Sequence, residues 1–212
     1  LEADAALAGA AGVSIIFAPS VEEMYPDGDP LIRISSGELG TKFEGATRPG
    51  HFDGVLAVVN KFFNIIRPAA GNHPVNAYFG QKDAQQYILI QRMVRDFNHD
   101  VTMRPVAIVR EDNGLALSSR NSYLSDEERE SALVLSRTLA MLRENSLNRG
   151  FHEIDLDGAR ERINSTPGVR LDYLELVDPM TFGEPTEESE RVLALVAAFV
   201  GPTRLIDNMD LR

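Results

Sequence analysis

One stretch constrains the fold more than any other: residues 78–86, which read Tyr-Phe-Gly-Gln-Lys-Asp-Ala-Gln-Gln. The pattern is typical of a strand end, a tight turn at Gly80 and the start of a helix. Asp83 and Gln86, three residues apart, predict an N-cap with a returning amide. The helix predicted over residues 83–97 keeps its apolar residues on one face, at helical spacing: Ile90, Met93, Val94 and Phe97.

This turn predicts an anion site. Backbone N–H groups at a helix start, the positive end of the helix dipole and the Lys82 ammonium would all point to one place, which suits a phosphate or a carboxylate. The alternative is structural, because a Gly-x-Lys-Asp turn before a helix also occurs simply as a turn and a cap. The motif alone leaves both interpretations open.

Composition excludes several classes of function. The 212-residue chain suits one large domain or two small ones, and its formal net charge of −11 argues against non-specific binding to nucleic acid or to an anionic membrane. Without cysteine, it has no disulfide, no thiolate nucleophile and no cysteine zinc site. No apolar run approaches the roughly 20 residues of a membrane span, and the first residues do not resemble a signal peptide. We therefore expect a cytoplasmic protein.

Strand and helix alternate through the first half of the chain. The pattern predicts a parallel doubly wound sheet, in which ligands bind at the carboxyl ends of strands. One face of a predicted helix carries Val55, Val58 and Val59. These valines either belong to the core or line a pocket for a small branched substrate. The predicted elements are helices over 3–11, 53–66 and 83–97, loops over 41–52 and 69–77, and strands over 13–17, 31–34, up to 79 and over 101–109.

The second half has a different order. A turn at 111–114 marks a boundary, so we predict domains over 1–109 and 110–212. After it, two hydroxyls and a guanidinium in Ser118-Ser119-Arg120 could bind phosphate oxygens, but the segment taken alone favours a helix-entry loop with a solvent-facing arginine. A capping box at Ser125 opens a helix to about residue 142. A helix over 155–164 and strands over 171–177, 192–200 and 204–207 complete an α+β arrangement.

Two other kinds of site are not predicted. The four histidines are scattered, with no His-Glu-x-x-His pattern, so no zinc site is expected. Ser118 and Ser119 lack the Gly-x-Ser-x-Gly setting of a serine hydrolase.

Taken together, five segments resemble the pantothenate synthetase family, the pantoate–β-alanine ligases. They are FEGATRPGHFDGV at 43–55, FGQKDAQQ at 79–86, LALSSRNSYL at 115–124, DYLELVD at 172–178 and RLIDN at 204–208. The resemblance runs in order from about residue 13 to the C-terminus. It implies a homodimer of subunits that each have a Rossmann-like N-terminal domain and a smaller C-terminal domain. It also implies that ATP, Mg²⁺ and pantoate give pantoyl adenylate and pyrophosphate, and that the amine of β-alanine then gives pantothenate and AMP.

The resemblance also implies residue roles. Gln86 would bind pantoate, and Val55, Val58 and Val59 would wall its dimethyl end. Glu44 and Arg48 would lie in a mobile flap beside the site. The implied ATP site comprises Gly80, Lys82, Asp83, Val109, Leu117, Ser118, Ser119 and Arg120, of which Lys82, Ser118, Ser119 and Arg120 would be catalytic.

The chain departs from the family pattern in three places. It has Gln81 where the family usually has Glu, and its link over 69–77 is longer. The family's opening third, with its His-x-Gly-His nucleotide motif, is absent. We therefore expect a Rossmann-like domain that is incomplete at its N-terminus, and an isolated chain that is inactive in pantothenate synthesis and prone to association. The alternatives to a ligase are a fragment that only dimerises or binds nucleotide, and a related nucleotidylyltransferase.

Overall fold

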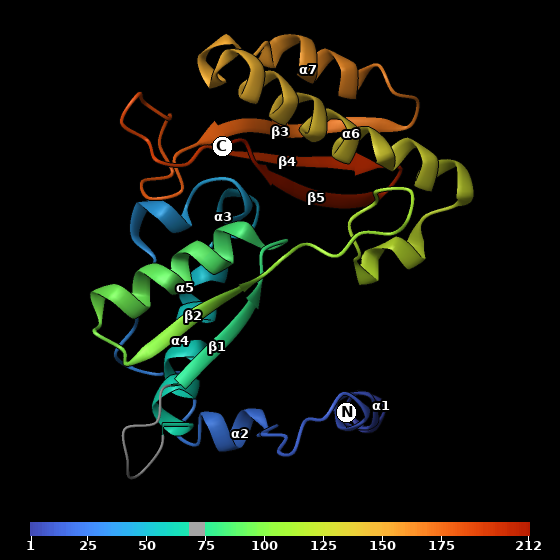
Figure 1. Ribbon diagram of the computed structural model, residues 1–212. Helices are drawn as coiled ribbons and strands as arrows, with labels where there is room; N and C mark the ends of the chain where they lie inside the picture. The colour runs from blue at the N-terminus through green and yellow to red at the C-terminus, as the bar shows by residue number, and fades with distance from the viewer. Residues whose placement is uncertain (68–74) are drawn as a thin grey trace. The chain divides into compact units, whose positions relative to one another are not determined.

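The computed structural model describes residues 1–67 and 75–212 and divides them into two compact units, residues 1–34 and 35–212 (Figure 1). The fold is mixed α/β, with a parallel sheet and a separate antiparallel sheet, as the sequence predicts. The predicted domain boundary after residue 109 falls inside the second unit and stays a prediction. Among the described residues, no helix is long and apolar enough to cross a membrane.

The first unit holds two helices, α1 (Glu2–Ala10) and α2 (Val21–Met24). The predicted strands over 13–17 and 31–34 are wrong, because both segments are irregular, with Ile15 84% and Leu31 101% exposed. A strand needs a neighbouring strand that pairs its N–H and C=O groups. Within the described ranges, neither segment has such a strand beside it.

The second unit begins with the parallel sheet and its helices. Strands β1 and β2 pair in parallel, with Val75 opposite Val101, which confirms the predicted strand–helix–strand order. The predicted loop over 41–52 is only partly right, since it contains a short helix and the start of the next. Of the loop predicted over 69–77, the part up to residue 74 lies outside the described residues, and the rest belongs to β1. The elements are η1 (Gly37–Gly40), α3 (Glu44–Thr47), α4 (His51–Ile65), β1 (Val75–Gly80), α5 (Ala84–Asp96) and β2 (Val101–Val106).

The antiparallel sheet has the order β3-β4-β5. Ser125 and Glu128 form the predicted capping box, and the helix that they open runs to Arg149, beyond the predicted end. The elements of this part are η2 (Ser119–Tyr123), α6 (Asp126–Arg149), η3 (Phe151–Glu153), α7 (Leu156–Asn164), β3 (Val169–Val177), β4 (Leu193–Val200) and β5 (Thr203–Asp210).

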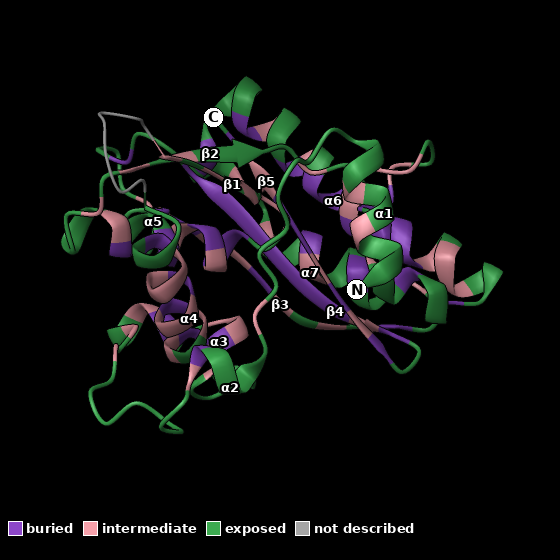
Figure 2. Cartoon of the chain, turned by 90° about the horizontal axis from the view of Figure 1, so that it is seen from below, coloured by how far each residue is buried: buried purple, intermediate pink, exposed green. Residues whose placement is uncertain are grey.

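The central strand β4 is covered on both faces, and Figure 2 shows it buried along nearly its whole length. On one face it joins the main core, where α6 and α7 pack on the sheet (Figure 1). On the other face, Leu193 and Leu195 pack with Ala84 at the start of α5. Burial on both sides explains why β4 reads as a continuous apolar run instead of an alternating one. This second cluster fixes the start of α5 against the antiparallel sheet.

Candidate functional site

A polar cleft lies where the start of α5, the α3–α4 segment and strand β5 meet. The cleft holds about 60 Å³ of solvent-accessible space and opens to the surface. Its lining residues are Glu44, Arg48, His51, Phe52, Lys82, Asp83, Ala84, Gln85, Gln86, Arg120, Tyr173, Leu195, Ile206, Asp207 and Asn208. The structure thus brings together the predicted turn at 80–86 and the predicted loop residue Arg120, which are far apart in the sequence.

The turn between β1 and α5 is held from the opposite sheet. Asn208 Nδ2 donates to the carbonyl oxygens of Gln81 at 2.9 Å and Lys82 at 3.0 Å. The predicted capping box of Asp83 and Gln86 is wrong, because the Asp83 side chain makes no cap hydrogen bond. The backbone of Asp83, at φ −88° and ψ 63°, is not in the extended conformation of a capping residue. Gln86 lines the cleft and so remains available to a ligand.

Three cations face this cleft without a carboxylate partner. Among the described residues, Lys82, Arg48 and Arg120 form no ion pair, whereas Arg110 and Arg204 form strong ones. A cation at the start of a helix adds to the partial positive charge of the free N–H groups there. The arrangement therefore favours an anion in the cleft, as the turn predicts.

The loop that carries Arg120 is tied to β5. The Arg110 guanidinium binds the Asp207 carboxylate at 2.7 and 2.9 Å, and the Asp207 side chain is only 4% exposed. Such a two-point contact fixes orientation as well as distance. Asn121 then holds the end of the loop, donating to Ala116 O at 3.0 Å. Arg120 consequently approaches the cleft from a supported loop.

The remaining predicted ATP residues lie around this loop. Ser118 Oγ accepts from the Arg120 N–H at 3.2 Å, and Ser119 opens the 3₁₀ helix η2. Ser118 and Lys82 both line a small neighbouring cavity of about 10 Å³. Leu117 N donates to Val109 O at 2.9 Å, so these two exposed apolar residues lie side by side. Gly80 ends β1, immediately before the turn.

The three valines predicted to contact pantoate lie on α4, outside the lining of the cleft. Val59 is buried, and Val55 and Val58 are half-buried, but none of the three lines the cleft. A larger groove of about 460 Å³ runs along Lys42, Phe43 and Glu175, and no predicted site residue lines it. The valines' contact with a substrate stays a prediction.

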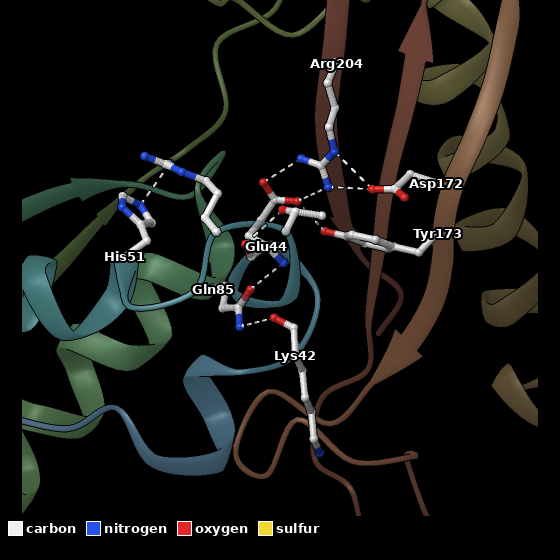
Figure 3. A network of polar contacts seen from close by, with 9 residues as sticks. Lys42, Glu44, His51, Gln85, Asp172, Tyr173 and Arg204 are labelled. Carbon is white, nitrogen blue, oxygen red and sulfur yellow. Dashed lines mark hydrogen bonds and ion pairs between the residues drawn. The ribbon is translucent and has the colours of Figure 1, made fainter.

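Sequence reasoning missed an ionic network around Glu44 (Figure 3). The Arg204 guanidinium donates to both Glu44 carboxylate oxygens, at 2.7 and 2.8 Å, and to Asp172 Oδ2 at 2.8 and 3.0 Å. Tyr173 OH donates to Glu44 Oε1 at 3.0 Å. The side chains of Arg204 and Glu44 are each only 17% exposed. This network fastens α3 to strands β3 and β5.

The ionisation of this network follows from its burial. Burial and then the negative charge of Glu44 raise the pKa of Tyr173, so its hydroxyl stays a donor. Burial works against the charge on Arg204, but its hydrogen bonds to Glu44 and Asp172 outweigh burial and raise its pKa. Arg204 therefore stays charged, and the Tyr173 hydroxyl stays protonated, at neutral pH.

Gln85, rather than its neighbour Gln86, is the buried glutamine of α5. It is 4% exposed, and it accepts from Glu44 N at 3.1 Å while donating to Leu39 O at 2.8 Å and Lys42 O at 3.0 Å. Its position could have been read from the sequence, because it lies four residues before the apolar Leu89 on the same helix face. A polar residue on an apolar face signals a satisfied internal contact.

His51 lies at the start of α4, beside Arg48. Arg48 Nη1 is 3.0 Å from His51 Nε2, so the ring nitrogen accepts when the guanidinium donates. Burial and the charge of Arg48 lower the pKa of His51 below its usual value. A neutral imidazole thus sits at one end of the cleft.

A protein with parallel β–α–β order and a cation-lined cleft at the carboxyl end of a strand belongs to the class of α/β ligand-binding proteins. The sequence profile described as pantoate-beta-alanine ligase matches residues 1–210. The chain is 51% identical to the pantothenate synthetase of Corynebacterium glutamicum (strain R), covering 100% of this chain and 74% of that one. The chain belongs to the pantoate–β-alanine ligase family, a family of enzymes that join two substrates.

Solved structures agree with this assignment. The pantothenate synthetase of Thermus thermophilus superimposes with a TM-score of 0.87 at 43% identity, over 99% of this chain and 74% of that chain. The pantoate-beta-alanine ligase of Francisella tularensis gives a TM-score of 0.73 at 32% identity, over 98% of this chain and 69% of that chain. The Francisella structure is a complex with beta-gamma ATP and beta-alanine.

Proposed function

We propose that this chain takes part in the ATP-dependent ligation of pantoate and β-alanine to pantothenate. Family membership supports the reaction class, and the Francisella relative that binds ATP and β-alanine supports the substrates. The observation that carries the proposal is the convergence of Lys82, Arg48 and Arg120 on one cleft without carboxylate partners among the described residues. A site for anionic substrates needs uncommitted cations of this kind.

The proposed reaction has two steps, with pantoyl adenylate between them. In the first, a pantoate carboxylate oxygen bonds to the α-phosphorus of ATP, and the bond to pyrophosphate breaks. In the second, the β-alanine nitrogen attacks the acyl carbon, loses a proton and displaces AMP. The first step brings one anion against another. Lys82 and Arg120 offset that repulsion and stabilise the charge that moves onto pyrophosphate.

The remaining residues would position the substrates. Gly80 and Asp83 flank Lys82 in the turn, and Ser118 and Ser119 would offer hydroxyls to phosphate oxygens. Val109 and Leu117 form an exposed apolar pair beside that loop, suited to an adenine ring. In this division the phosphates would occupy the cleft, and the base would lie against the exposed apolar pair.

Pantoate would contact Gln86, which lines the cleft near Lys82. The roles of Val55, Val58 and Val59 rest on the family resemblance alone. Homodimerisation and a cytoplasmic location are also part of the proposal and rest on family membership. Among residues 1–67 and 75–212, no group of three or more His, Asp or Glu side chains could hold a metal ion. We therefore assign the implied Mg²⁺ no ligand here and place no step on it.

The test is a coupled assay of pyrophosphate and AMP release on this chain and on the longer Corynebacterium relative. For the relative we expect pyrophosphate release that requires pantoate, AMP release that requires β-alanine, and no nucleotide on the final product. Nucleotide retained on the product would indicate a nucleotidylyltransferase. Release by the relative and not by this chain would agree with the expectation, drawn from the sequence, that the isolated chain is inactive.

A further inference from the structure

Glu44 begins the short helix α3 (Glu44–Thr47), and Arg48 follows the helix as its C-cap residue, with a backbone outside the helical range at φ −135° and ψ 68°. Both side chains line the same cleft, where their opposite charges would attract one another. In this structure they form no ion pair. The Glu44 carboxylate binds Arg204 at 2.7 and 2.8 Å, and Arg48 instead contacts His51 (Figure 3).

We infer that Arg204 is a positioning residue that holds Glu44 away from Arg48, and so keeps the Arg48 guanidinium open to a substrate carboxylate in the cleft. Arg204 itself does not line the cleft, whereas Glu44, Arg48 and His51 do. It acts through Glu44 and not by contact with substrate. The identity of the carboxylate rests on the proposed function, because pantoate and β-alanine each carry one.

The geometry makes Arg204 a strong competitor for Glu44. Its planar guanidinium reaches both Glu44 oxygens and is oriented from the other side by Asp172. Tyr173 adds a third donor to the same carboxylate. Two-point contacts in a partly buried place are stronger than an exposed ion pair, since the local dielectric is lower. Arg48 is exposed and has no comparable support.

A second set of contacts holds the α3 segment without Arg204. Gln85 binds the backbone of Leu39, Lys42 and Glu44. Gly45 also packs so closely on Gly40 that a Cβ there would lie 1.9 Å from the Gly40 carbonyl oxygen. Because these contacts stay in place, removal of the Arg204 guanidinium should free the Glu44 side chain more than it displaces the backbone.

The first test measures how fast phenylglyoxal modifies Arg48, by peptide mapping in a mass spectrometer. Arg204→Gln should slow modification of Arg48 about threefold, the scale of a partly exposed ion pair. The double variant Arg204→Gln/Glu44→Gln removes the competing carboxylate and should restore the wild-type rate. Arg92→Gln, which breaks an exposed pair with Asp96 on α5, is the matched control and should change nothing.

The second test measures dissociation constants of pantoate and of β-alanine by calorimetry on the same variants. The substrate whose carboxylate binds Arg48 should have a dissociation constant at least about threefold higher for Arg204→Gln than for the wild type. The double variant should return that constant to the wild-type value. The other substrate should bind with an unchanged dissociation constant, so the comparison identifies which substrate's carboxylate uses Arg48. A double variant no better than Arg204→Gln in either assay would overturn the inference, because Arg204 would then only brace α3.

Folding and function are separated by two further measurements. Far-ultraviolet circular dichroism reports whether Arg204→Gln is folded. If it is not, Arg204→Lys keeps the charge but loses the fork, and should slow Arg48 modification by a smaller factor. An unchanged Arg48 rate in the folded variant overturns the inference. If the wild-type chain binds neither carboxylate, the proposed function fails, while the modification rates still decide whether Arg204 restrains Glu44.

Discussion

The two walls of the cleft differ in how their polar side chains are engaged. On the side of β3 and β5, Arg204, which lies behind the cleft lining, binds two carboxylates, and Asn208 binds two backbone carbonyls. On the wall formed by the α3–α4 segment and the start of α5, Lys82 and Arg48 form no ion pair within the described residues. The polar groups of the first side are committed to the structure, whereas on the second side Glu44 and Gln85 are engaged and the cations Lys82 and Arg48 are left for a ligand.

Burial of the two sheets follows the same division. Strand β4 is buried at nearly every position, while β1 alternates between half-buried and exposed residues. Stability should therefore depend mainly on the antiparallel sheet, and ligand use mainly on the turn after β1. Substitutions in each region test this difference between stability and ligand use.

The largest effect is expected at Lys82. Lys82→Ala should lower pantoate-dependent pyrophosphate release about 100-fold, close to 2.7 kcal/mol, the scale for loss of one preorganised electrostatic donor. Its thermal midpoint should stay near that of the wild type, because no described ion pair is lost. The rate is best measured in the Corynebacterium relative at the aligned position. A near-normal rate there would leave the turn a structural role only.

Gln86→Glu tests the neighbouring position on the same wall. The new carboxylate would face the pantoate carboxylate, so the apparent affinity for pantoate should fall about 30-fold. Since Asp83 does not cap α5 with its side chain, no capping contact with Gln86 is at stake, and the melting temperature should not change. A large loss of stability with unchanged pantoate affinity would show that Gln86 supports the helix.

A matched pair of valines compares the sheets directly. Val196 in β4 is 1% exposed, and Val106 in β2 is 43% exposed. Val196→Ala should cost about 2 kcal/mol of unfolding free energy from lost burial and the cavity left behind. Val106→Ala should cost less than about 0.5 kcal/mol. Denaturant titrations give both values, and equal costs would mean that the parallel sheet is as tightly packed as the antiparallel one.

The smallest effect concerns His51, whose pKa is lowered by burial and by Arg48. The folded state binds this proton more weakly than the unfolded state does, so its contribution to stability is present above about pH 6.5 and is lost as the pH falls through the lower folded pKa. Glu44 and Asp83 oppose the shift. Melting temperatures should therefore fall slightly less on acidification in His51→Gln than in the wild type. Identical pH profiles would remove this role for His51.

Sequence reasoning succeeded where local chemistry decides the structure. The capping box at Ser125 and the apolar run at 193–200 each contain their own signal, and both elements formed as predicted. It failed at 13–17 and 31–34, where apolar composition resembles a strand but no described segment supplies the pairing. Whether a neighbouring strand is present to pair with a segment depends on the tertiary structure, and the composition of the segment does not reveal it.

For the candidate site, too, short motifs predicted some residues, and contacts between distant residues were missed. The turn at 80–86 and the loop at 118–120 were identified from short motifs, and the structure brings Lys82, Gln86 and Arg120 to one cleft. The Glu44–Arg204 pair joins residues 160 positions apart, and nothing local marks it. Asp83 was misread because its backbone conformation, and not its residue type, decides whether it caps.

The central claim is that this cleft binds nucleotide phosphate through Lys82. Calorimetric titration of the 212-residue chain with ATP tests it most directly, with Arg92→Ala, on the helix that follows the turn, as the control for loss of an exposed cation. We predict binding by the wild type and by Arg92→Ala, and an affinity at least about tenfold lower for Lys82→Ala. Equal ATP affinity in Lys82→Ala and the wild type, or no binding by the wild type, would contradict the claim.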